Sequence, residues 1–206
     1  MIVELKGVEF ENKGSYLMLL AIQSELYSRM PNVKFAIRAS SVASPEQIRQ
    51  VPALRKINLR KNIFDFNKLT YLIPSTMRRF LIKCGIVLES DVDMIMDASG
   101  FSYSDQWSSN VRIYHLENEL RRFNLTQKLY IFLPQAFGPF SDKDTCDRIR
   151  NSFRHAAMIC ARDKNSFEHL KKILGRPSNL HQFPDITVNL DGFINEAAEI
   201  YQDTAC

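Results

Sequence analysis

The chain has 206 residues, which is enough for one substantial domain with a buried core, and its 45% hydrophobic and 24% charged residues are typical of globular proteins. A formal charge of +4 argues against a dedicated nucleic-acid binder, whose basic residues would be strongly clustered. The four cysteines form no Cys-x-x-Cys pair, which argues against a zinc site and a disulfide framework. We therefore expect no metal, no nucleic-acid partner and a cytoplasmic location with reduced cysteines.

Apolar periodicity and turn signals predict strands that alternate with helices along the whole chain. Ser141 is the predicted N-cap of one helix, with Asp144 at the capping-box spacing, and Asp163 is the predicted N-cap of the next. The predicted strands are 2–10, 32–40, 54–60, 92–99, 128–135, 158–162 and 179–186, and the predicted helices are 16–30, 44–51, 75–86, 104–123, 141–156 and 163–174.

This order of elements favours an α/β fold, with an open, mostly parallel sheet and helices on both faces. Ligands of such sheets bind outside the carboxyl ends of the strands. Residues that follow the predicted strands are therefore the first candidates for a binding site.

The first strand-to-helix turn reads "ENKGSY" and contains Asn12 and Gly14. A glycine permits a tight turn, and a helix start offers free backbone N–H groups to an anion. The spacing matches neither a dinucleotide-binding glycine motif nor a Walker loop. An ordinary turn explains the same residues.

The buried strand at 92–99 leads into "DASGFSYSD". Asp97 or Asp105 has the chemistry to accept a proton or to hydrogen-bond sugar hydroxyls, and Gly100 allows a ligand close to the backbone. The aromatic faces nearby suit the apolar face of a sugar ring. The alternative is that Asp105 caps the next helix and that the aromatic side chains belong to the core. Those aromatic residues are Phe101, Tyr103 and Trp107.

Two further strand ends carry polar side chains. Gln135 in "LPQAFGPF" has an amide that can hold a hydroxyl, and Arg162 in "ARDKNSFEHL" has a guanidinium that can bind a carboxylate or phosphate. The alternatives are a structural Gly-Pro turn after Gln135, and a helix N-cap at Asp163 after Arg162. The helix "STMRRFLIKCGI" combines an apolar face with basic residues, which fits either a core-facing helix or a helix on an anionic membrane.

Taken in order, five motifs resemble the polysaccharide pyruvyl transferase family: "KGVEFENKGSYLMLLAI", "DMIMDASGFSYSDQW", "FLPQAFGPF", "ARDKNSFEHLK" and "FPDITV". The resemblance runs from residue 5 to about residue 188. It implies Rossmann-like halves in a GT-B-like architecture, of which this chain resembles the N-terminal one. We accordingly expect residues 1–190 to form a Rossmann-like domain, and 191–206 to begin the connection to a second domain.

The resemblance also implies transfer of a pyruvyl group from phosphoenolpyruvate to a pair of sugar hydroxyls, in capsule, exopolysaccharide or cell-wall synthesis. Phosphoenolpyruvate is then a substrate, no cofactor is needed, and the acceptor is a sugar or a lipid-linked oligosaccharide, with a peripheral contact at the inner face of the membrane. Relatives continue into a second half with further donor-binding cations, so the activity of this chain alone stays open.

Transferring these roles to the present residues makes Asp97 and Asp105 the expected catalytic pair, as hydroxyl ligands with one as the base. The expected substrate-binding residues are Asn12, Gly14, Ser99, Gly100, Gln135 and Arg162. Two other functions remain open. One is a GT-B-like glycosyltransferase that uses a nucleotide sugar, and the other is a non-catalytic sugar-binding module.

Overall fold

The computed structural model describes residues 1–40, 43–105, 110–175 and 177–189, and over these residues the chain forms one eight-stranded parallel sheet and a small antiparallel hairpin. The sheet strands are β1 Ile2–Lys6, β2 Lys34–Arg38, β3 Ala53–Lys56, β6 Ile86–Val87, β7 Met94–Asp97, β8 Leu129–Gln135, β9 Met158–Ala161 and β10 Leu180–Gln182, and the hairpin is β4 Arg60–Lys61 and β5 Phe64–Asp65. The predicted boundary at residue 190 and the segment 191–206 lie outside the described residues.

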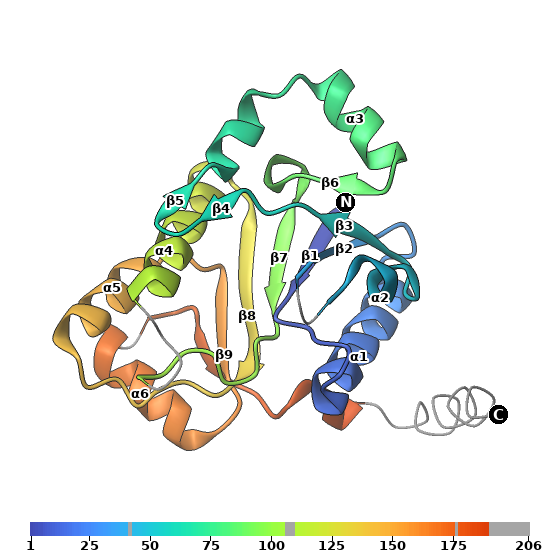
Figure 1. The fold of residues 1–206 in the computed structure, drawn as a ribbon. Coiled ribbons are helices and arrows are strands. Elements are labelled where there is room, and N and C mark those ends of the chain that lie inside the picture. The colour runs from blue at the N-terminus through green and yellow to red at the C-terminus, as the bar shows by residue number, and fades with distance from the viewer. Residues whose placement is uncertain (41–42, 106–109, 176, 190–206) are drawn as a thin grey trace.

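Helices connect the strands and cover the sheet (Figure 1). None of the helices among the described residues is both long enough and apolar enough to cross a bilayer. The α-helices are α1 Lys13–Arg29, α2 Pro45–Arg49, α3 Ser75–Lys83, α4 Asn110–Leu125, α5 Lys143–Phe153 and α6 Lys164–Leu174, and the 3-10 helices are η1 Asn67–Leu72, η2 Glu89–Asp91 and η3 Ile186–Asn189.

The strand order is β10-β9-β8-β7-β1-β2-β3-β6. The chain therefore builds outward from β1 through β2 and β3, and then returns to place β7 on the other side of β1. Later strands continue outward from β7. This is a doubly wound, Rossmann-like arrangement, and it confirms the predicted fold class. The winding direction reverses between β1 and β7, so the connections on their two sides diverge and leave a crevice.

Successive side chains of each strand point to opposite faces of the sheet, so a separate hydrophobic core forms on each face. In β7, Ile95 packs in one core, whereas Met94 and Met96 pack against the other. The first core contains α4, α5 and α6 residues such as Phe123 and Phe153, and the second contains residues of α1 and α2. Figure 1 shows the two groups of helices on opposite sides of the sheet.

Several predicted boundaries were wrong, and left-handed glycines explain two of the differences. The first strand ends at Lys6, because Gly7 adopts φ +79°. The predicted strand 54–60 divides into β3 and the start of the β4–β5 hairpin. The predicted helix 75–86 ends at Lys83, because Gly85 adopts φ +79° before edge strand β6. The helix predicted from 104 is described only from Asn110, and 106–109 lie outside the described residues.

The structure confirms Asp163 as a helix N-cap, whereas the predicted N-cap Ser141 was wrong. The Asp163 side chain accepts the Ser166 backbone N–H at 2.8 Å, as predicted for an N-cap. The cap of α5 is Asp142 and not Ser141, because the Asp142 carboxylate accepts the Thr145 backbone N–H at 2.7 Å. Ser141 lies one residue too early to reach that position.

Candidate active site

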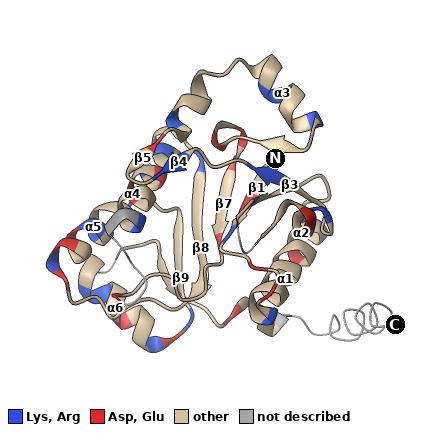
Figure 2. Ribbon diagram, in the orientation of Figure 1, with Lys and Arg blue, Asp and Glu red and all other residues tan. Residues whose placement is uncertain are grey.

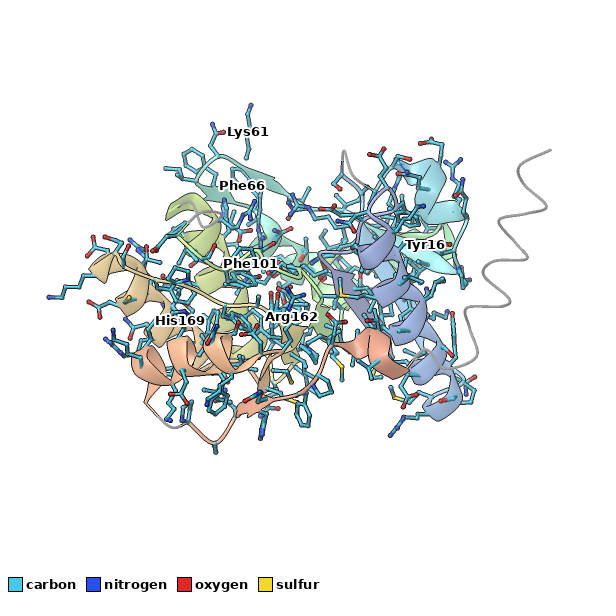
Figure 3. The ribbon with its side chains drawn as sticks, turned by 90° about the horizontal axis from the view of Figure 1, so that it is seen from below. Tyr16, Lys61, Phe66, Phe101, Arg162 and His169 are labelled. Atoms are coloured by element: carbon cyan, nitrogen blue, oxygen red, sulfur yellow. The ribbon has the colours of Figure 1, made fainter. Side chains whose placement is uncertain are left out.

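A hollow of about 320 Å³ lies at the carboxyl edge of the sheet, at the reversal between β1 and β7. We call it the switch-point hollow. Figure 3 views this edge and places Phe101 near Arg162, between α6 and α1. Five of the six predicted substrate-binding residues line the hollow, together with residues that include Gly7, Glu9 and Asp185. The five are Asn12, Gly14, Ser99, Gly100 and Arg162.

The start of α1 forms one wall of the switch-point hollow. The Asn12 side chain caps the helix by accepting the Ser15 backbone N–H at 3.2 Å, and the Ser15 hydroxyl accepts the Glu9 backbone N–H at 2.8 Å. These bonds fix the turn between β1 and α1. The N–H groups of the first turn have no carbonyl one turn earlier to bind, so a helix start of this kind favours an anion.

Gly7 allows the β1 turn to touch the segment that follows β7. A Cβ atom built on Gly7 would lie 2.3 Å from Ser99 Oγ and 2.4 Å from Ser99 Cα. Gly7 also has φ +79°, in the left-handed region that side chains with a Cβ rarely adopt. The two walls of the hollow therefore meet at this glycine, which the sequence pattern placed inside the predicted strand 2–10.

Replacing Gly7 with alanine is expected to lower the free energy of unfolding by roughly 2–4 kcal/mol, because backbone strain and a clash with Ser99 add together. Urea denaturation measures this loss. Gly85→Ala is the matched control, since Gly85 has the same φ but nothing within 4 Å of an added Cβ. An equal loss in both variants would show that the Gly7–Ser99 contact has no role.

Arg162 supplies the cation of the switch-point hollow. Its backbone N–H donates to the Gln135 carbonyl at 3.1 Å, which fixes the residue at the end of β9. Its guanidinium Nη1 lies 3.5 Å from Asp185 Oδ2, and the two side chains are 39% and 30% exposed. A long, solvated ion pair of this kind contributes little to stability. The guanidinium can therefore turn from Asp185 toward an anionic ligand at little cost.

Asp97 is fully buried beneath this hollow and does not line it. Its Oδ2 accepts the hydroxyls of Tyr103 at 2.6 Å and Tyr130 at 2.7 Å, while Oδ1 accepts the Ser99 hydroxyl and the Ser99 backbone N–H. Lys6 Nζ lies 3.6 Å from Oδ2. Burial first, and then the Asp97 charge, raise the pKa values of both tyrosines. Asp97 thus holds the Ser99 turn in place.

Gln135 and Asp105 do not line the hollow. Gln135 is buried and donates its amide Nε2 to the Asp97 carbonyl at 3.2 Å. Asp105 is exposed and accepts the Ser141 backbone N–H at 2.8 Å and the Ser141 hydroxyl at 2.7 Å. Asp105 therefore links the segment after β7 to the loop after β8, instead of capping a helix among the described residues.

The aromatic residues divide between core and site. Tyr103 is 2% exposed and packs against Phe132, Phe137 and Phe153, so it belongs to the core. Phe101 is 39% exposed and lines the switch-point hollow, where its ring is available to a sugar. Trp107 lies outside the described residues.

A buried charge network lies behind the site. Glu119, which is 2% exposed, is 2.9 Å from Lys6 Nζ, 3.0 Å from Arg60 Nη2 and 3.8 Å from Lys56 Nζ. Burial alone would raise the pKa of Glu119, but the charges of Arg60, Lys6 and Lys56 outweigh burial and hold it well below its ordinary value. The Lys56 ammonium also pairs with the Glu4 carboxylate. Buried carboxylates therefore hold Lys6, Lys56 and Arg60 in place.

No functional role was predicted from the sequence for Gly7, Glu9 or Asp185. Gly7 and Glu9 lie within the segment predicted as the first strand. The glycine at position 7 was the one sequence feature that could have indicated an earlier end of that strand. Asp185 follows a proline near the end of a predicted strand. A position at a strand end is the same signal that identified Arg162. Within the four described ranges, no three His, Cys, Asp or Glu side chains gather closely enough to hold a metal ion.

Comparison with known proteins agrees with the five motifs. A family model described as polysaccharide pyruvyl transferase matches residues 12–202. This range includes α1, the segment after β7 and the Arg162 loop, so it covers nearly every residue that lines the switch-point hollow. No curated protein matches the chain.

Proposed function

Because the chain belongs to the polysaccharide pyruvyl transferase family, we propose that its switch-point hollow takes part in moving a pyruvyl group from phosphoenolpyruvate to two hydroxyls of a sugar. Family membership itself indicates a transferase with a sugar or polysaccharide acceptor. The observation that carries the proposal is the gathering of Asn12, Gly14, Ser99, Gly100 and Arg162 around one hollow at the reversal of strand order.

The reaction joins an enol phosphate to a diol. A proton adds to the methylene carbon of phosphoenolpyruvate, the two sugar hydroxyls form bonds to the neighbouring carbon, and inorganic phosphate leaves. The products are a cyclic pyruvate ketal and phosphate, so no oxidant and no cofactor is needed. The protein must bind the carboxylate and phosphate of the donor and must remove protons from the attacking hydroxyls.

Arg162 and the start of α1 are the groups that suit the anionic donor. The guanidinium can form two parallel hydrogen bonds with a carboxylate or phosphate. Its long contact with Asp185 leaves it free to exchange partners. The first-turn N–H groups of α1, beside Gly14, add backbone donors on the facing wall.

Glu9 is the carboxylate that we assign as the general base. It lines the hollow, and its carboxylate forms no ion pair or hydrogen bond with any described residue. Asp185, the other carboxylate of the lining, already accepts hydrogen bonds from the Thr187 backbone and hydroxyl. In this proposal Asp97 is a positioning residue that fixes the Ser99 turn, and Asp105 positions the loop after β8.

Incubation of the chain with phosphoenolpyruvate and an oligosaccharide tests the proposal, with a two-domain relative as positive control. Phosphate release together with a mass gain on the sugar supports pyruvyl transfer. Sugar binding in the absence of phosphate release would indicate the binding module instead. Consumption of a nucleotide sugar would indicate a glycosyltransferase.

The proposal places the protein in the cytoplasm, in a GT-B-like architecture to which the described sheet contributes one half. The free cysteines Cys84, Cys146 and Cys160 are compatible with a reducing compartment. Neither a metal nor a nucleic acid is part of the proposal.

A peripheral contact with an anionic membrane is also part of the proposal, and α3 is the segment that supports it. Met77 and Phe80 of α3 are 54% and 65% exposed, and Leu72, at the end of the preceding η1, is 79% exposed. Arg79 and Lys83 are exposed on α3, and Figure 2 shows basic residues along this helix. Apolar side chains with cations beside them fit the boundary between acyl chains and anionic headgroups.

Replacing Phe80 with serine is expected to weaken binding to vesicles rich in anionic lipid by about tenfold, because a buried phenylalanine contributes roughly 1.5–3 kcal/mol. Co-sedimentation with the vesicles measures this effect. Phe183→Ser is the matched control, since Phe183 is 48% exposed and lies beyond β10. Equal binding by both variants and the wild type would remove α3 from the membrane contact.

A further inference from the structure

A second hollow, of about 580 Å³, adjoins the switch-point hollow. Gly7, Glu9 and Ser99 line both, so the two spaces meet at the Gly7–Ser99 contact. We call the second space the basic hollow. It lies between the ends of β1 and β2, the β4–β5 hairpin and the first turns of α4. Arg162 and the start of α1, which are assigned to the donor, do not line it.

Four permanent cations line the basic hollow, and each comes from a different element. Lys6 ends β1, Arg38 ends β2, Arg60 begins β4 and Arg112 lies in the first turn of α4. Among the described lining residues, Glu9 is the one carboxylate. Like charges repel when they are brought together. The fold, and not attraction between these cations, therefore holds them near one another.

A buried carboxylate partly balances the charge of two of these cations. Lys6 and Arg60 share the buried carboxylate of Glu119. Burial alone would lower the pKa values of both, but Glu119 and neighbouring acids outweigh burial and raise them, so both stay protonated. Their carboxylate partners hold them in place while they face the hollow.

Arg38 has no such partner. Its guanidinium forms no ion pair or hydrogen bond with any described residue, although it lines a hollow beside Arg60. Burial first, and then the Arg60 charge, lower the pKa of Arg38. A cation that is partly desolvated and repelled by its neighbour is stabilised when an anion binds between the two.

Neutral donors complete the lining. Ser40, Asn58 and Asn62 come from the loop and hairpin regions. His115 also lines the hollow, with Nε2 2.6 Å from the Asn62 carbonyl oxygen, and its Nδ1 atom is buried without a hydrogen-bond partner among the described residues. Guanidinium groups with hydroxyl and amide donors are a set that suits phosphate oxygens better than a neutral sugar.

We propose that the basic hollow binds the phosphate or diphosphate group of a phosphate-linked saccharide acceptor, while the switch-point hollow holds the sugar and the pyruvyl donor. The assignment to the acceptor rests on the proposed function. The binding of a phosphate-type anion by Arg38 and Arg60 does not depend on the proposed function. The shared residues Glu9 and Ser99 would then stand between the anion and the reacting hydroxyls, so that the phosphate anchors the saccharide.

Titration of the chain with inorganic pyrophosphate, followed by calorimetry, tests the anion site. We expect saturable binding that weakens as salt rises, and a loss of about tenfold or more in affinity for Arg38→Gln. Arg49→Gln is the matched control, because Arg49 is an exposed arginine of α2 that lies outside both hollows. An absence of saturable binding, or equal affinities for the two variants, would overturn the proposal.

A second arm separates the acceptor phosphate from the donor phosphate. Phosphoenolpyruvate binding is expected to weaken in Arg162→Gln and to persist in Arg38→Gln. Pyrophosphate binding is expected to weaken in Arg38→Gln and to persist in Arg162→Gln. If Arg38→Gln weakened phosphoenolpyruvate binding as much as pyrophosphate binding, the basic hollow would belong to the donor and the acceptor assignment would be wrong. Both arms measure binding, so a chain that binds pyrophosphate through Arg38 but transfers no pyruvyl group would refute the proposed function alone.

Discussion

Replacement of Glu9 by glutamine is expected to lower the rate of pyruvyl transfer by about 10²–10⁴-fold, which is the usual contribution of a positioned general base. Glutamine keeps the size and hydrogen-bonding reach of the side chain but cannot accept a proton. Glu9 lines both hollows, and its carboxylate is unpaired among the described residues. The rate under saturating phosphoenolpyruvate and acceptor is the quantity to measure.

Glu11→Gln provides the control for this variant. Glu11 is exposed in the same turn and lines neither hollow. It reports what the loss of one negative charge near the site does by itself. If the two variants transferred at the same rate as the wild type, Glu9 would not be the base. Asp185 would then be the remaining lining carboxylate to test in the same way.

Replacement of Asp97 by alanine is expected to lower the free energy of unfolding by about 3–5 kcal/mol, as when one partner of a buried charged network is removed. The change would leave the Tyr103 and Tyr130 hydroxyls without their common acceptor in the core. It would also release the Ser99 turn and remove a carboxylate near Lys6. Chemical denaturation followed by circular dichroism measures the loss.

Asp93→Ala is the control at the other end of the same strand. Asp93 is exposed, and its carboxylate accepts the Ile2 backbone N–H at 2.8 Å. We expect this variant to cost about 1 kcal/mol or less. If Asp97→Ala unfolded at the same denaturant concentration as Asp93→Ala, the buried network would contribute nothing. Asp97 would then have to be reconsidered as a catalytic group.

The location of the switch-point hollow was predictable because parallel strands share one carboxyl edge. Asn12, Ser99 and Arg162 each follow a strand, so the alternation of strands and helices was sufficient to expect them along that edge. Their gathering into one hollow also needed the strand order. The sequence does not state that β7 returns beside β1, but the right-handed doubly wound topology makes this neighbourhood a common one.

The basic hollow was not predictable in the same way. Helix α2 and strand β3 separate Arg38 from Arg60 along the chain, and Arg112 lies in a helix much later in the sequence. Only the path of the β4–β5 hairpin brings Arg60 toward Lys6 and Glu119, whereas the sequence placed Arg60 at the end of the predicted strand 54–60. Asp97 illustrates a similar limit. Its burial depends on Tyr103 and Tyr130, whose hydroxyls meet it from separate segments.

A crystal structure of this chain with phosphoenolpyruvate bound would show whether the crevice between β1 and β7 holds the donor. We predict that the carboxylate or phosphate of phosphoenolpyruvate contacts the Arg162 guanidinium and the start of α1, with the enol carbon on the side of Glu9. Phosphoenolpyruvate bound in the basic hollow against Arg38, or bound with no contact to Arg162, would contradict the account.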